Sequence, residues 1–132
     1  MLSYFNSPDI NMLLEQSIFN YEHHKYAACC ATTGVLLEEI CACILIEQGK
    51  TEKELEKTTL YVLIGQLRTL GVITRREVNQ LVAASMIRNS ASHQATGYIV
   101  EAHCDILYTA CKSVFTYYMN FMNQKNVNEE GD

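Results

Sequence analysis

The stretch of residues 26–46 constrains the fold more than any other part of the sequence. Its apolar side chains recur at helical spacing on adjoining stripes, which predicts a helix buried over most of its girth. The stretch is nearly long enough to cross a membrane, but Glu38 and Glu39 lie inside it. Because charged side chains are costly in lipid, we expect the core helix of a soluble, cytoplasmic protein that does not enter the membrane.

Helical spacing recurs along the rest of the chain, and no strand pattern appears. Helices are expected over residues 8–21, 24–48, 51–57, 60–70, 74–89 and 98–123. The sequence therefore predicts an all-α fold, an antiparallel bundle of four to five helices with a long C-terminal helix. We expect residues 1–6 to be a flexible N-terminus, residues 7–123 one bundle domain, and residues 124–132 a disordered acidic tail without an apolar pattern.

Two features of the core helix bear on a site. Gly34 has no side chain, so another helix can approach closely there. Glu38 and Glu39 are adjacent, and adjacent residues point about 100° apart on a helix. One carboxylate can therefore reach solvent while the other faces inward. Because an inward carboxylate needs a cation, Arg88 is the first candidate partner.

The charge of the chain restricts its partners. A net charge of −5 argues against a general coat for nucleic acid, whose non-specific affinity comes from neutralised phosphates. A small local site remains open, because all four arginines fall within one 21-residue window. They are Arg68, Arg75, Arg76 and Arg88.

Cysteine and histidine do not form a metal-binding pattern. All six cysteines lie in expected apolar helices, so we predict reduced thiols that pack as small hydrophobes. His23 and His24 are neighbours that diverge on a helix, and His103 lies on an apolar stripe, where a satisfied core histidine is expected. Neither a metal ion nor another cofactor is therefore expected.

Residues 86–93, Met-Ile-Arg-Asn-Ser-Ala-Ser-His, carry the sharpest chemical signal. Arg88 is a fixed cation that can hold a phosphate at two points, and His93 titrates near neutral pH. Together they could bind and cut an RNA backbone. They could also be a polar clasp, in which Arg88 bonds carbonyls at a helix end and His93 caps the last helix.

The last expected helix has a wide apolar face. The face consists of two adjoining seams, one through His103 and Ile106 and the other through Cys104 and Leu107. Together they are wider than the apolar face that a four-helix core needs. The surplus could cover a homodimer interface.

The order of three segments resembles the HEPN superfamily. These are Leu-Leu-Glu-Glu at residues 36–39, a leucine-rich helix that ends in Leu-Gly-Val-Ile at residues 70–73, and the segment 86–93. The resemblance covers residues 21–118 and is nearest to the stand-alone bacterial domains that accompany restriction and defence loci. A rival resemblance is to the mannitol operon repressor family, which has a similar Leu-Gly-Val-Ile step before an Arg-Asn segment.

The HEPN resemblance implies a helical bundle that pairs as a homodimer and cuts RNA without metal. His93 would act as general base or acid at a ribose 2′-hydroxyl, and Arg88 would stabilise charge on the phosphate. Asn89 would orient the histidine or the phosphate, while Glu38 or Glu39 would position Arg88. The product would be a 2′,3′-cyclic phosphate, and an antitoxin or defence-complex protein would be a partner.

One position departs from the toxin branch that nucleotidyltransferase partners regulate. That branch has a tyrosine two residues after the histidine, where this chain has Ala95, and the nearest tyrosine is Tyr98. We therefore do not expect that form of control. The alternative function is a non-catalytic helical module that dimerises, binds a nucleotide or protein, or regulates transcription, as the repressor resemblance implies.

Overall fold

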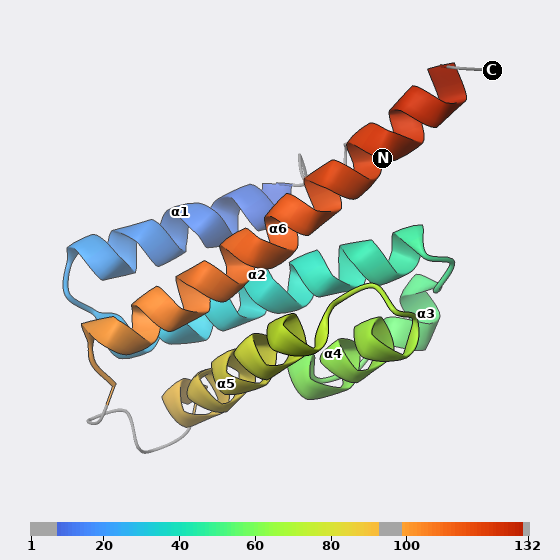
Figure 1. Cartoon of the computed structure of the whole chain (residues 1–132). Coiled ribbons are helices and arrows are strands. Elements are labelled where there is room, and N and C mark those ends of the chain that lie inside the picture. Colours follow the sequence, from blue (N-terminus) through green and yellow to red (C-terminus); the bar gives the residue numbers. More distant parts are fainter. Residues whose placement is uncertain (1–7, 93–98, 131–132) are drawn as a thin grey trace.

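The computed structural model describes residues 8–92 and 99–130, in which helices are joined by turns and short loops and no strand occurs (Figure 1). The described residues contain six helices: α1 Pro8–Glu22, α2 Tyr26–Glu47, α3 Glu52–Leu55, α4 Leu60–Thr69, α5 Arg75–Ser92 and α6 Glu101–Glu130. The expected all-α bundle with a long C-terminal helix is confirmed. Residues 1–6, which we expected to be flexible, and His93 lie outside the described residues.

Helix α2 is the centre of the bundle. Helices α1, α4, α5 and α6 all pack against it. In Figure 1, α1 runs along one side of α2, α4 and α5 lie on the opposite side, and α6 crosses over it. Of the described helices, α2 alone is long and apolar enough to span a membrane, but the bundle covers most of its apolar stretch. This position fits the core helix of a soluble helical domain.

Helix boundaries follow local hydrogen bonds and turn residues. The expected capping box before α5 is confirmed, because Thr74 N donates to Glu77 Oε1 at 3.1 Å and Glu77 N donates to Thr74 Oγ1 at 3.2 Å. Thr59 caps α4 in a similar way. Gly49 and Gly71 follow α2 and α4 with φ values of 103° and 70°, the left-handed conformation that ends helices.

Two helices continue beyond their expected ends. Helix α5 reaches Ser92 instead of Asn89, because the extra turn buries Ala91 in the core. Helix α6 reaches Glu130, so the expectation of a disordered tail is wrong for residues 124–130. No glycine or proline interrupts the chain between Asn123 and Gly131, so the backbone can continue as a helix.

The cysteines and His103 test two further expectations. All six cysteines are free and buried in α2 and α6, as predicted. His103 is satisfied, but not in the core. It is only partly buried, and its Nδ1 accepts a hydrogen bond of 3.0 Å from the backbone N–H of Val100 beside the start of α6.

Candidate functional site

An ion pair joins α5 to the core helix at the centre of the expected site. Arg88 Nη2 lies 3.2 Å from Glu38 Oε1, and the two side chains are only 27% and 23% exposed. The expected partnership between Arg88 and one of the two adjacent glutamates is therefore confirmed for Glu38. Glu39 is exposed, and Asp9 of α1 is among the groups that raise its pKa, after desolvation.

Gly34 makes room for the arginine. A Cβ atom at Gly34 would overlap Arg88 Cγ and would lie 2.9 Å from Arg88 Cβ. The aliphatic part of Arg88 thus crosses α2 directly above the glycine, and Glu38 receives the guanidinium one helical turn further along. The expectation that Gly34 admits a neighbouring helix is confirmed. We call Gly34, Glu38 and Arg88 the Arg88 site.

Partial burial sets the electrostatics of this site. Desolvation raises the pKa of the Glu38 carboxyl group, the Arg88 guanidinium lowers it, and the neighbouring charge of Glu39 raises it again. The net direction is upward, so desolvation outweighs the attraction to Arg88. A pair in this balance contributes more to the orientation of its members than to stability.

The guanidinium has binding capacity left. Arg88 Nε is buried and has no hydrogen-bond partner among residues 8–92 and 99–130. A buried donor without a partner costs about 1–3 kcal/mol. A hydrogen bond from Nε to an acceptor would remove this cost. An arginine fork held by a carboxylate at one nitrogen can present its remaining donors to a planar or tetrahedral anion.

The other members of the expected site are described only in part. Asn89 is exposed on α5, next to Arg88. His93 follows the last residue of α5 in the sequence and lies outside the described residues, so its convergence with Arg88 remains a prediction.

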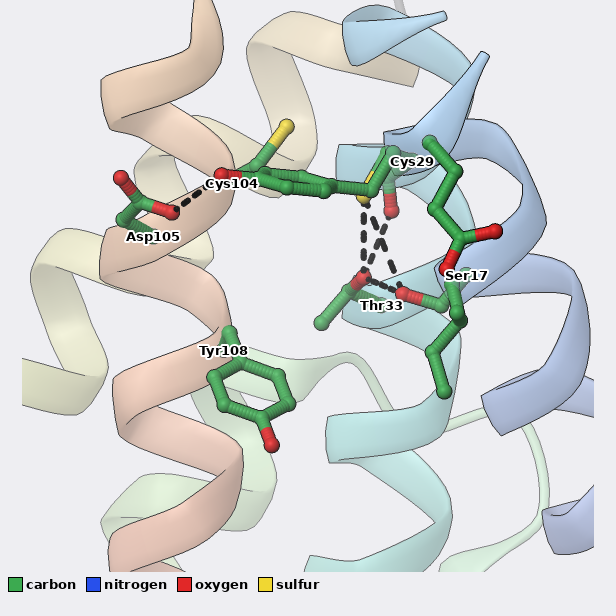
Figure 2. A pocket seen from close by; sticks show the side chains of 9 residues that line it. Ser17, Cys29, Thr33, Cys104, Asp105 and Tyr108 are labelled. Atoms are coloured by element: carbon green, nitrogen blue, oxygen red, sulfur yellow. Dashed lines mark hydrogen bonds between the residues drawn. The ribbon is translucent and has the colours of Figure 1, made fainter. Parts of the chain in front are cut away.

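A second feature, absent from our expectations, is a hollow between α1, α2 and α6. It encloses about 400 Å³ and is lined by Ser17 and Tyr21 of α1, Thr33 of α2, and Asp105 and Tyr108 of α6, among others. Figure 2 shows Ser17, Cys29 and Thr33 clustered at one wall, opposite Asp105 and Tyr108. The sequence signal that could have found it is the hydroxyl of Thr33, a polar group within an apolar stripe of the core helix.

A family model matches residues 15–129 of the 132-residue chain. The chain belongs to the DUF4145 family. The description of that family is a domain of unknown function, and the matched range of the DUF4145 domain includes both the Arg88 site and the hollow. No curated protein and no solved structure matches the chain. The resemblances to HEPN domains and to the mannitol operon repressor therefore remain predictions.

In this DUF4145 domain Arg88 lies apart from Arg75 and Arg76, although all three belong to the same 21-residue window of the sequence. Arg75 and Arg76 are exposed at the start of α5, whereas Arg88 lies near its end. At 1.5 Å per residue, the 12–13 residues between them correspond to about 18–20 Å. Arg68 is exposed on α4. Arg88 is thus separated from the two arginines at the start of its own helix.

Proposed function

We propose that this chain is a metal-independent endoribonuclease of the HEPN type, which acts as a homodimer in a toxin or defence setting. The observation that supports the proposal is the Arg88 site. A guanidinium is held by Glu38 above Gly34, is partly open to solvent, and lies five residues before a histidine in the sequence.

In the proposed reaction, His93 of one copy takes the proton of a ribose 2′-hydroxyl. The 2′-oxygen attacks the adjacent phosphorus, and the bond from phosphorus to the 5′-oxygen of the next nucleotide breaks. The histidine of the second copy protonates that leaving oxygen, which gives a 2′,3′-cyclic phosphate and a 5′-hydroxyl. Arg88 stabilises the charge that develops on the non-bridging oxygens, a contribution of about 10²–10³ in rate for one well-placed donor.

Glu38 acts as a positioning residue in this proposal. It fixes one nitrogen of the guanidinium, Nη2, and the part of the Arg88 side chain that is exposed, 27%, is left for phosphate. Asn89, exposed beside Arg88, orients the phosphate or the histidine. Exposed apolar side chains support the pairing of two copies, since Val100, just before α6, and Ile106 on α6 are 52% and 40% exposed in one copy.

The test is cleavage of total RNA by the purified protein in the presence of a chelator. We expect cleavage with cyclic phosphate ends by the wild type, and none by His93→Ala or Arg88→Ala. Arg76→Ala is the matched control, because Arg76 is exposed and remote on the same helix. Cleavage that persists in both site variants, with helix content and oligomeric state unchanged, would contradict the proposal.

A second candidate is a non-catalytic helical module that binds a nucleotide or protein or regulates transcription. The net charge of −5 and the separation of Arg88 from the arginines at the start of α5 favour it, because non-specific affinity for RNA comes from several cations that neutralise phosphates. This candidate predicts no cleavage by the wild type, and loss of partner binding when residues 86–93 are altered.

A further inference from the structure

The hollow between α1 and α6 is large enough for a small molecule. Its floor is formed by α2, which both flanking helices contact. Beside the main cavity of about 400 Å³ lies a second one of about 220 Å³, which shares Ser17 and Tyr108 and continues to Leu36 and Ile40. We call the two together the α1–α6 hollow. Ligand sites in proteins are apolar cavities of about this size with a few polar groups.

The polar groups of the floor are acceptors. Thr33 Oγ1 donates its only proton to the carbonyl oxygen of Cys29 at 2.7 Å. In the hydrogen bond between Ser17 and Thr33, Ser17 is therefore the donor. Ser17 Oγ has two lone pairs, of which Cys29 Sγ, 3.8 Å away, can engage one, and the side chain is buried at the wall that the two cavities share. The floor thus offers an oxygen acceptor to an occupant.

The mouth of the hollow is acidic. The Tyr21 hydroxyl donates to Glu101 Oε1 at 2.7 Å and lies 3.4 Å from Asp105 Oδ1. Glu22 lines the same end. Within the described ranges, the ion pairs of the protein involve other carboxylates, those of Glu38 and Glu54. Glu22, Glu101 and Asp105 at the mouth therefore have no lysine or arginine of the described ranges as an ion-pair partner.

We propose that the α1–α6 hollow binds a small amphipathic organic cation. The ammonium group lies at the mouth, near Glu22 and Asp105, where the aromatic faces of Tyr21 and Tyr108 add cation–π attraction. The apolar body follows Ile18 toward Leu36 and Ile40. The same carboxylates disfavour an anion at the mouth, whereas Lys112 lines the second cavity, which does not include Glu22 or Asp105. Charge complementarity thus selects the occupant, and the apolar cavity sets its length.

This site is separate from the Arg88 site. Leu36 is two residues from Gly34 on α2, which corresponds to about 200° around the helix. The proposal does not depend on RNA cleavage, and variants at the mouth of the α1–α6 hollow leave Arg88 untouched.

The test uses decyltrimethylammonium below its micelle concentration, with decyl sulfate as the anion of equal chain length. Calorimetry should show saturable 1:1 binding of the cation and at least about tenfold weaker binding of the anion, which corresponds to about 1.4 kcal/mol. In NMR spectra, the shifted resonances should be those of Ser17, Thr33 and Tyr108. Bound cation should raise the melting temperature.

Variants at the mouth sharpen the test. Glu22 and Asp105 are exposed, so the double variant Glu22→Gln with Asp105→Asn should keep the fold. Its affinity for the cation should be about fivefold lower, which is the contribution expected of two exposed charge pairs. Glu54→Gln, remote on α3, is the matched control and should leave binding unchanged. Equal affinity for cation and anion, a lowered melting temperature, or shifts confined to other residues would overturn the proposal. The proposal would also be overturned if a helical peptide, and not the cation, shifted the resonances of Ser17, Thr33 and Tyr108.

Discussion

The two sides of α2 differ in how they meet their neighbours. On one side Gly34 and Glu38 admit Arg88, so the space above the glycine is filled by an arginine stem and closed by an ion pair. On the other side Cys29 and Thr33 form the floor of a hollow that no side chain of residues 8–92 and 99–130 fills. A small residue therefore brings helices together on one side, whereas residues of ordinary size leave α1 and α6 apart on the other. One side is suited to hold a charged group rigidly, and the other to admit a molecule.

The largest expected effect comes from a substitution on the side of α2 that Arg88 fills. Gly34→Ala places a methyl group on the stem of Arg88, and overpacking of this kind costs about 2–3 kcal/mol of unfolding free energy. Gly65→Ala on α4 is the matched control, because a Cβ there meets nothing within 4 Å. It should stabilise the protein by about 0.5–1 kcal/mol through helix propensity. Urea unfolding of both variants tests the contrast, and equal effects would contradict the close approach of α5.

A smaller effect separates the two adjacent glutamates. Glu38→Ala leaves the guanidinium of Arg88 without its carboxylate and should cost about 1–2 kcal/mol. Glu39→Ala removes an exposed side chain and should stay within about 0.5 kcal/mol. Thermal unfolding at neutral pH measures both. A larger cost for Glu39 would mean that the wrong carboxylate has been assigned to Arg88.

Substitutions on the side of α2 that faces the α1–α6 hollow should lower the stability less. Thr33→Val keeps the volume of the side chain but removes the acceptor for Ser17, which should cost about 1 kcal/mol. Thr32→Val, one residue away and only half-buried, should change stability by less than about 0.5 kcal/mol. If the two variants behave alike in urea unfolding, the buried hydroxyl pair does not stabilise the floor of the α1–α6 hollow.

The subtlest test is the pH dependence of the Arg88 site. Because the pKa of Glu38 is raised on folding, mainly by desolvation, the folded state favours the protonated form. The stabilisation from this group is present below its unfolded pKa and is lost as the pH rises through the higher folded pKa. The stability of the wild type relative to Glu38→Gln should therefore fall between acid and neutral pH. An increase over that window would show that attraction to Arg88 outweighs desolvation.

The sequence predicted the filled side of α2 better than the open side. Helical spacing, the missing side chain of Gly34 and the adjacent glutamates together pointed to an inward carboxylate, with Arg88 as its partner. These features are local, and the geometry of one helix was enough to deduce them. The capping box at Thr74 was equally local.

The rest depended on three-dimensional arrangement. The α1–α6 hollow exists because two helices that are distant in sequence contact α2 without closing on each other, and no spacing rule encodes that distance. The dispersal of the arginines follows from the length of α5, which separates Arg76 from Arg88. The continuation of α6 to Glu130 was missed because a helix needs no apolar pattern to persist once it is formed.

The most direct test of the central claim is the rate of RNA cleavage, in chelator, by Arg88→Lys compared with Arg76→Lys. Both variants keep the charge, but only the first loses a guanidinium held by a carboxylate. Our account predicts a loss of about 10²-fold or more for Arg88→Lys, with its fold intact, and no change for Arg76→Lys. Equal rates in the two variants, or no cleavage by the wild type, would contradict the claim that the Arg88 site carries the chemistry.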